Sequence, residues 1–471
     1  MNDDDVAFAD CATLKRLLER RTLSSLELTN LYLARLEKYG GAYNAVVTLM
    51  PERARAEARR ADKERAAGRL RGPLHGIPYG VKDLLATAGA PTTWGAEPYR
   101  RQRFNYDATV VRKLGQAGAV LLAKLAMVEL AGGFGYDEAN ASFTGPGRTP
   151  WNRDYWSGGS SSGSGAAVAA GLVGFAIGSE TSGSILFPST SCGVTGLRPT
   201  FGRVSRQGAM ALCWTLDKLG PMTRSAVDAE NVLRAISGSD PGDPSTVDRP
   251  FLNSKRRPRI GVLAKATQKT MPGVKANFEA ALRVLAEFCD VVDEVAVPRL
   301  PYGAAVGTIV RAEGAAAFRD LIESGRSREL RAVDDRTGGY AGYATPAIDY
   351  IDALRQRTFM IAAFEHAFGK YDAIVSPTLH TVAYPIDLRF DKAYPKYRGA
   401  VSLIASGNLT GVPAIGIPNG FGEHGLPTGL SLLGRPFCET KLTAIARRYQ
   451  ALTNHHLKRP KLVALSLNLS R

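Results

Sequence analysis

Residues 157–198 read SGGSSSGSGAAVAAGLVGFAIGSETSGSILFPSTSCGVTGLR, and this stretch decides the fold. Residues 157–165 are only serine and glycine, a composition typical of a flexible linker. Here the run leads directly into the apolar segment 166–173, which predicts a deeply buried helix. We therefore interpret the run as a tight loop whose backbone closely approaches another group, because glycine permits such an approach. A strand is predicted at 175–179, followed by a second loop of small residues at 180–184.

On both sides of this stretch, helix patterns alternate with strand patterns. Helices are predicted at residues 12–20, 24–36, 51–68, 108–117 and 441–452, and over most of 300–370. Strands are predicted at residues 79–83, 119–123, 259–263, 372–378, 413–418 and 429–434, and residues 275–298 are predicted to form a helix and a strand. This alternation predicts an α/β fold with helices covering both faces of a sheet.

The composition is that of a folded enzyme-sized chain. The 471 residues are 45% hydrophobic and 22% charged, which excludes a disordered or fibrous protein. The net charge of +16 raises the question of nucleic acid. However, the densest basic run, residues 53–71, is interleaved with Glu57, Asp62 and Glu64, as on a solvated helix face. No nucleic-acid-binding motif accompanies it, so we predict no nucleic-acid partner.

The cysteines and the N-terminus bear on the compartment. The five cysteines lie far apart without any C-x-x-C spacing, which favours neither a disulfide framework nor a zinc site. A reducing compartment fits best, so we predict a cytoplasmic protein. The first five residues are acidic where a secretory signal would be basic. No uninterrupted run of about 18 apolar residues occurs, so no association with a membrane is expected.

The sequence contains many hydroxyl nucleophiles, and the question is which one has an activating base. None of the six histidines lies in a context that suggests a Ser-His-Asp site, and no G-x-S-x-G elbow is present. A serine–lysine device remains, and it requires a lysine kept neutral by burial. Lys82 fits, because it lies between Val81 and Leu84 in an apolar strand. A salt-bridged lysine beside Asp83 is the alternative on local sequence alone.

Several motifs in order resemble those of the amidase signature family. They occupy residues 72–83 (GPLHGIPYGVKD), 158–163 (GGSSSG), 178–184 (GSETSGS), 192–200 (CGVTGLRPT), 202–205 (GRVS) and 217–224 (DKLGPMTR). The resemblance is dense from about residue 8 to 240 and recurs at 371–378, 408–418 and 425–436. It implies a single large domain over residues 1–471, with a mixed, twisted central sheet covered on both faces by helices. Within it we expect a helical segment at 1–70, the catalytic signature core at 72–240 and a substrate-side part at 241–471.

The resemblance implies a serine–cis-serine–lysine triad. By motif position Ser184 is the nucleophile, Ser160 follows a cis peptide bond and Lys82 is the base. Neutral Lys82 would take a proton from Ser160, which would take one from Ser184 as an acyl-enzyme forms. The oxyanion hole would consist of four consecutive backbone N–H groups, those of Thr181, Ser182, Gly183 and Ser184. No metal or organic cofactor is expected.

Two departures from the family pattern lie in the nucleophile loop. Ser182 stands where the family usually has glycine, and Leu186 replaces an arginine. That arginine normally pairs with the acid four residues before the nucleophile, which is Glu180 here. Glu180 therefore needs another partner or remains solvated.

The family includes the glutaminase subunit of tRNA-dependent amidotransferases. That subunit carries an aspartate seven residues before an asparagine, where this chain has Val401 before Asn408. A cationic head group would then lack its counter-charge. We therefore predict a stand-alone hydrolase for uncharged, partly apolar amides, and also for anilides, esters and carbamates, because the family includes aryl-acylamidases and urethane hydrolases.

Two alternatives stay open. The first is the amidotransferase glutaminase subunit, which the basic charge mildly favours. The second is a non-catalytic binding protein on the same scaffold, which the retained Lys82, Ser160 and Ser184 argue against. The expected partner is a small-molecule amide or carbamate, and the expected state is a monomer or homodimer.

The substrate pocket is the least defined part of the prediction. We expect its walls to come from residues 127–136, 302–311 and 348–359. The individual candidates are Gly132, Gly133, Tyr136, Leu186 and Trp214.

Overall fold

The fold is built around one mixed sheet. The computed structural model describes residues 1–252 and 256–464. The 11-stranded sheet has the order β1-β3-β2-β6-β8-β7-β12-β13-β11-β9-β10. Its strands are β1 (Val46–Leu49), β2 (Pro78–Lys82), β3 (Val120–Leu125), β6 (Phe175–Glu180), β7 (Thr195–Arg198), β8 (Lys218–Thr223), β9 (Arg259–Leu263), β10 (Asp290–Val295), β11 (Ala373–Pro377), β12 (Ala414–Phe421) and β13 (Pro427–Gly434). A separate ribbon joins β4 (Arg148–Thr149) to β5 (Asn152–Trp156).

The register of the sheet places the candidate site. Strands β2 and β6 are parallel neighbours, as are β2 and β3, whereas β6 through β11 pair antiparallel in the centre of the sheet. Because parallel neighbours end at the same edge, β2 ends with Lys82 beside the end of β6 at Ser179 and Glu180. The lysine and the nucleophile loop therefore leave the sheet side by side.

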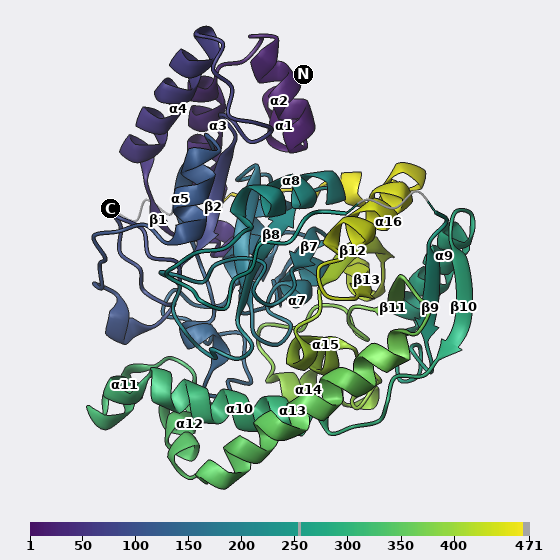
Figure 1. Cartoon of the computed structure of the whole chain (residues 1–471). Helices are drawn as coiled ribbons and strands as arrows, with labels where there is room; N and C mark the ends of the chain where they lie inside the picture. The colour runs from purple at the N-terminus through teal and green to yellow at the C-terminus, as the bar shows by residue number, and fades with distance from the viewer. Residues whose placement is uncertain (253–255, 465–471) are drawn as a thin grey trace.

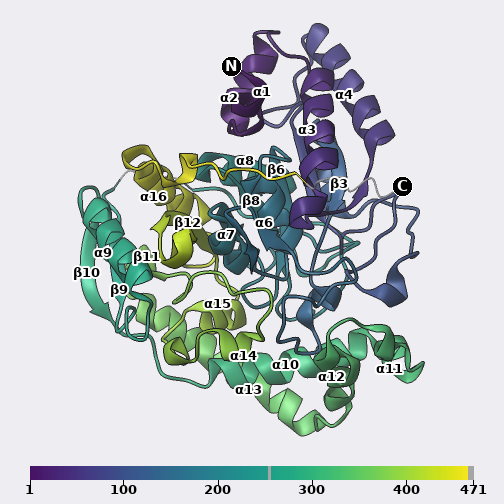
Figure 2. The same ribbon diagram turned by 180° about the vertical axis from the view of Figure 1, so that it is seen from behind.

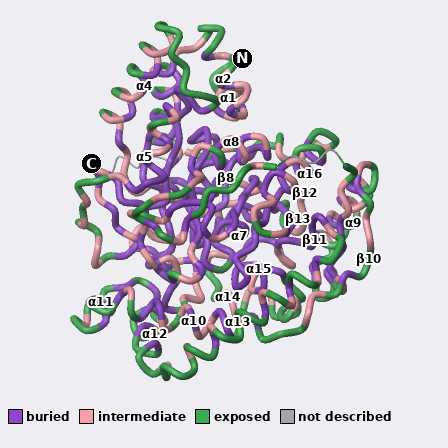
Figure 3. Tube along the Cα trace, in the orientation of Figure 1, coloured by how far each residue is buried: buried purple, intermediate pink, exposed green. Residues whose placement is uncertain are grey.

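Helices cover the sheet on both faces (Figures 1 and 2). The pair α6 (Ser162–Ala169) and α7 (Leu186–Cys192) packs together against the central strands, and so does the pair α8 (Ala226–Ile236) and α16 (Glu439–Leu452). The remaining helices are α1 (Asp3–Ala7), α2 (Cys11–Glu19), α3 (Ser25–Tyr39), α4 (Pro51–Ala66), α5 (Thr109–Gln116), α9 (Pro272–Ala286), α10 (Tyr302–Ala317), α11 (Arg319–Glu323), α12 (Val333–Tyr343), α13 (Ala347–Phe368), α14 (Phe390–Ala393) and α15 (Ile404–Thr410). Helices α1–α4 lie at the top of Figure 1, and α10–α13 form its lower edge. In the same orientation, Figure 3 shows the buried residues concentrated around the central strands.

The predicted α/β architecture with a mixed sheet and helices on both faces is confirmed. The predicted capping box is also present, since Ser24 accepts from the Glu27 backbone and Glu27 reaches back to Ser24. No helix in residues 1–252 or 256–464 is long and apolar enough to cross a membrane.

One local prediction needs correction. The serine and glycine run is not a loop throughout, because α6 already begins at Ser162. Small residues let this helix lie against its neighbours: a Cβ on Gly165 would stand 2.9 Å from the Pro188 carbonyl oxygen of α7. A Cβ on Gly163 would stand 2.4 Å from the backbone nitrogen of Ala126. The glycines therefore serve close helix packing as well as the loop.

Candidate active site

Lys82 lies at the centre of a buried group of hydroxyls. Its side chain is fully buried at the end of β2. The amine donates hydrogen bonds to Ser160 Oγ at 2.7 Å and to Ser179 Oγ at 2.9 Å. The sequence analysis assigned no role to Ser179, although its place at the end of β6 beside β2 could have indicated the contact.

The electrostatic surroundings favour the neutral amine. Burial lowers the pKa of Lys82 to about 7, although the charges of Asp217 and Glu180 oppose the shift. The alternative of a salt bridge to Asp83 does not hold, because that carboxylate pairs with the buried Lys124 at 2.8 Å. Lys82 can therefore lose its proton near neutral pH, as a general base must.

Ser160 and Ser184 belong to two loops that lie against each other. The peptide bond between Gly159 and Ser160 is cis. The loops are joined by the backbone, since the Ser161 N–H donates to the Ser184 carbonyl oxygen at 3.3 Å. Within residues 1–252 and 256–464, no hydrogen bond joins the hydroxyls of Ser160 and Ser184. Proton transfer between them therefore requires a closer approach when substrate binds, as is common in ligand-free enzymes.

The loop before Ser184 offers unpaired backbone donors. The N–H groups of residues 181–184 donate to no acceptor in the described part of the chain. The next three are occupied: Ile185 and Leu186 donate to Glu180 at 2.9 and 3.0 Å, and Phe187 donates to the Gly183 carbonyl at 2.8 Å. Gly183 has a φ of +96°, which favours glycine. Four adjacent free donors are the arrangement that stabilises an oxyanion.

The Glu180 carboxylate accepts the N–H groups that follow Ser184, and its ion-pair partner is Arg198. Arg198 Nη1 lies 3.0 Å from Glu180 Oε1, and Asn408 Nδ2 donates to the same oxygen at 2.9 Å. Both charged side chains are fully buried. Burial alone would raise the pKa of Glu180, but the adjacent guanidinium and the hydrogen bonds lower it overall. Arg198 therefore supplies the counter-charge that an arginine at position 186 would provide. The spacing of the residues along the chain does not indicate this Arg198–Glu180 pair.

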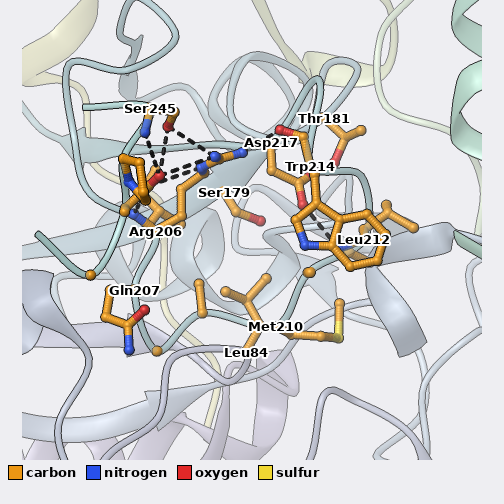
Figure 4. Close-up of a pocket in the computed structure, with 18 residues that line it drawn as sticks. Leu84, Ser179, Thr181, Arg206, Gln207, Met210, Leu212, Trp214, Asp217 and Ser245 are labelled. Carbon is orange, nitrogen blue, oxygen red and sulfur yellow. Dashed lines mark hydrogen bonds and ion pairs between the residues drawn. The ribbon is translucent and has the colours of Figure 1, made fainter. Parts of the chain in front are cut away.

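A cavity of about 400 Å³ lies next to Ser179, the second hydroxyl that Lys82 contacts (Figure 4). Ser179, which contacts Lys82, and Thr181 line it together with Asp217. Asp217 accepts from the Thr181 hydroxyl at 2.6 Å, so it ties the cavity wall to the nucleophile loop. Trp214 lies at the edge of the cavity and remains 49% exposed.

Of the predicted pocket residues, Trp214 lines this cavity, whereas Gly132, Gly133, Tyr136 and Leu186 do not. Gly132 and Gly133 follow Ala131, which lines the cavity. Tyr136 packs edge-on against Trp156 and Phe390, within an aromatic cluster. Leu186 is 2% exposed and lies under the nucleophile loop. Of the predicted segments, 348–359 lies on α13, where several side chains face outward.

A second cavity, of about 480 Å³, lies on another side of the nucleophile loop. It is bordered by Phe187, three residues after Ser184, and by Ile404, which approaches Gly183. Its remaining walls combine the aromatic side chains of Tyr384, Phe390, Tyr394 and Tyr397 with polar and charged residues, among them Asp137, His380 and Arg398. The sequence analysis missed this cavity, because these aromatic residues come from segments without regular periodicity.

No group of three or more His, Cys, Asp or Glu side chains in the two described ranges is placed to hold a metal ion.

Comparisons with known proteins agree on the type of enzyme. The Amidase family model matches residues 27–443. The A subunit of the glutamyl-tRNA(Gln) amidotransferase of Moorella thermoacetica is 37% identical over 95% of this chain and 97% of its own length. The crystal structure of the peptide amidase from Stenotrophomonas maltophilia has a TM-score of 0.84 at 32% identity, covering 96% of this chain and 98% of the other. The corresponding amidotransferase protein of Thermotoga maritima has a TM-score of 0.79 at 29% identity, covering 98% and 99%.

These relatives overturn the predicted substrate class. Proteins between 35% and 37% identical over almost the whole chain carry the name of the amidotransferase A subunit. The prediction of a stand-alone hydrolase for uncharged, partly apolar amides is therefore wrong. It gave too much weight to one position, Val401, against similarity that extends over the whole chain.

The predicted partners are wrong for the same reason. A small-molecule amide or carbamate without nucleic acid conflicts with relatives that are named as one component of an amidotransferase for glutamyl-tRNA. The scattered basic residues were a poor guide, because one component of an assembly need not carry a nucleic-acid motif itself.

Proposed function

The chain belongs to the amidase family, and from this premise we propose that it is the glutaminase component, the A subunit, of a glutamyl-tRNA(Gln) amidotransferase. As a member of that family it is an amidohydrolase. The finer assignment rests on the relatives that share more than a third of its residues along its length. The proposed substrate is the side-chain amide of glutamine, a linear amide, and the proposed compartment is the cytoplasm.

The observation that carries the proposed amide hydrolysis is the buried amine of Lys82 at 2.7 Å from Ser160 Oγ. Neutral Lys82 accepts the Ser160 proton, and Ser160 accepts the proton of Ser184 as its Oγ bonds to the amide carbon. The N–H groups of residues 181–184 stabilise the oxyanion; losing one such donor typically costs about 3–4 kcal/mol of barrier. Collapse of the tetrahedral intermediate returns one proton through Ser160 to the nitrogen and expels ammonia. Water then attacks the acyl-enzyme by the reverse relay, which releases glutamate and frees Ser184.

The ammonia is the product that an amidotransferase uses. We propose that it passes to the other subunits, which activate the side-chain carboxylate of the glutamyl group on the tRNA with a phosphoryl group from a nucleoside triphosphate. Ammonia then displaces phosphate and forms the glutaminyl amide. This chain would then contact the tRNA only through that assembly, which agrees with a basic surface without a nucleic-acid motif.

The experiment compares glutamine hydrolysis with tRNA amidation. The chain is produced with the other amidotransferase subunits of its source organism, and both activities are measured. Ser184→Ala should abolish glutamine hydrolysis and glutamine-dependent amidation, with thermal stability nearly unchanged. Amidation with free ammonium should survive, because it bypasses this site. Ser324→Ala, an exposed serine on the loop after α11, is the matched control and should retain both activities.

Two results would contradict the proposal. One is a wild-type chain that releases no ammonia from glutamine, alone or in the assembly, yet hydrolyses a peptide amide. The other is a Ser184→Ala chain that still supports glutamine-dependent amidation.

A further inference from the structure

Helix α13 presents an uncovered apolar stripe to solvent. Its inner side is anchored by Ala353, Met360, Phe364 and Phe368, which are all buried. On the outer side Ile348, Ile351 and Phe359 are 73%, 55% and 67% exposed. The helix runs along the lower edge of the molecule in Figure 1, away from the sheet. Isolated apolar residues on a surface need no explanation, but three large ones exposed on one helix call for a partner.

Charged residues complete the stripe. Ile348, Asp352, Arg355 and Phe359 follow one another at intervals of four, three and four residues, which is the spacing of a coiled-coil seam. Asp352 and Arg355 are exposed, and neither forms an ion pair in residues 1–252 or 256–464. The order along the seam is therefore apolar, acidic, basic, apolar.

This order is complementary to itself when reversed. If a second α13 lies antiparallel, one register places Ile348 opposite Phe359 of the second copy at both ends of the seam. The same register places Asp352 opposite Arg355 of the second copy, twice by symmetry. A shift of three residues in either direction would instead oppose two aspartates or two arginines. A two-fold contact requires this kind of self-complementary surface.

We propose that a second copy of this chain docks on α13, antiparallel, through Ile348, Asp352, Arg355 and Phe359. One helix seam buries less than the roughly 800 Å² per partner of a stable interface. Association should therefore be reversible and depend on protein concentration. The proposal does not depend on the function of the active site.

The test uses the symmetry of the charge pairs. The mass in solution is measured by sedimentation over a range of protein concentrations. Asp352→Arg and Arg355→Asp should each weaken association about tenfold or more, because each opposes like charges at two places. The double variant Asp352→Arg, Arg355→Asp should restore association, because it re-forms both pairs with their signs exchanged. Glu365→Arg, at an exposed position on the same helix beyond the stripe, is the matched control and should associate like the wild type.

Phe359→Asp should also favour the monomer, and its circular dichroism and melting temperature report whether it folds. A wild-type chain that stays monomeric at its highest soluble concentration would overturn the proposal and assign the stripe to another protein. A double variant as weak as the single variants would also overturn the proposed antiparallel register. Glutamine hydrolysis is measured on the same samples, so loss of activity and loss of association are separate results.

Discussion

At the scale of a residue, the proton state of Lys82 controls the proposed chemistry. Its amine is fully buried, and the hydroxyls of Ser160 and Ser179 are its close partners. Burial lowers its pKa to about 7, so both proton states are populated at physiological pH. Only the neutral state can accept a proton from Ser160.

We predict that kcat/KM for glutamine rises with pH through about 7 and then levels off, since the fraction of neutral Lys82 grows over that range. Lys82→Met should lower kcat by several orders of magnitude and remove this rise. Burial also lowers the pKa of Lys218 to about 7, so Lys218→Met is the control that identifies the lysine. If the rise disappears in Lys218→Met and persists at residual activity in Lys82→Met, Lys82 is not the base.

Val401 is the second residue on which the proposed function makes a prediction. The family resemblance places an aspartate at this position in the amidotransferase glutaminase, and Val401 is 41% exposed. Val401→Asp should lower KM for glutamine about two- to fivefold, because an exposed ion pair to the ammonium group contributes little more than that. Initial rates over a range of glutamine concentrations measure the change, and Val401→Asn controls for polarity without charge. An equal effect of both variants would show that charge is not involved.

At the scale of secondary structure, the Glu180–Arg198 pair and its hydrogen bonds connect four elements. Glu180 ends β6 and accepts the first N–H groups of α7, Arg198 ends β7, and Asn408 belongs to α15. The conformation of the nucleophile loop therefore depends on the buried Glu180 carboxylate and its partners, and not on residues 181–184 alone. Removing one partner would leave the other charge buried without compensation.

We predict that Arg198→Met destabilises the chain by about 3–5 kcal/mol, because Glu180 loses its counter-charge in the interior. Adding Leu186→Arg should recover part of the loss, since it returns an arginine to the position that resembles the family pattern. Urea denaturation of the two variants measures the difference. Leu186→Arg alone is the control: it should destabilise, because Arg198 already satisfies Glu180. A double variant less stable than Arg198→Met would exclude the exchange of partners.

At the scale of the whole molecule, one sheet and one core join the predicted segments. Strand β7, within residues 72–240, pairs with β12, within residues 241–471. A single cluster of buried residues extends from Ala7 to Tyr449. We therefore propose that the whole chain is a single folding domain.

We predict one cooperative transition in calorimetry, with equal calorimetric and van't Hoff enthalpies. Proteolysis between β8 and β9, near residue 250, should destabilise both halves together, because each half leaves strands of the shared sheet unpaired. Two separate transitions, or one fragment that stays folded alone, would contradict a single domain.

The sequence predicted much of the fold and the position of each motif, because periodicity and capping act within a few residues. The helix that begins at Ser25 is an example, since its cap and its apolar spacing are both local. The start of α6 inside the serine and glycine run could not be predicted, because contacts with Ala126 and with α7 decide it. The aromatic cavity beside Phe187 was missed for the same reason.

The sequence by itself determined the α/β class, the family, and the positions of Lys82, Ser160 and Ser184, but not the strands β1, β7 and β8. Only the tertiary structure decided how the buried charges pair: Asp83 with Lys124, which leaves the amine of Lys82 to the serines, and Glu180 with Arg198. The physical reason is the distance along the chain between the interacting residues. Local patterns reflect neighbours along the chain, whereas the pairing and proton affinity of a buried group depend on strands and loops that the fold brings together.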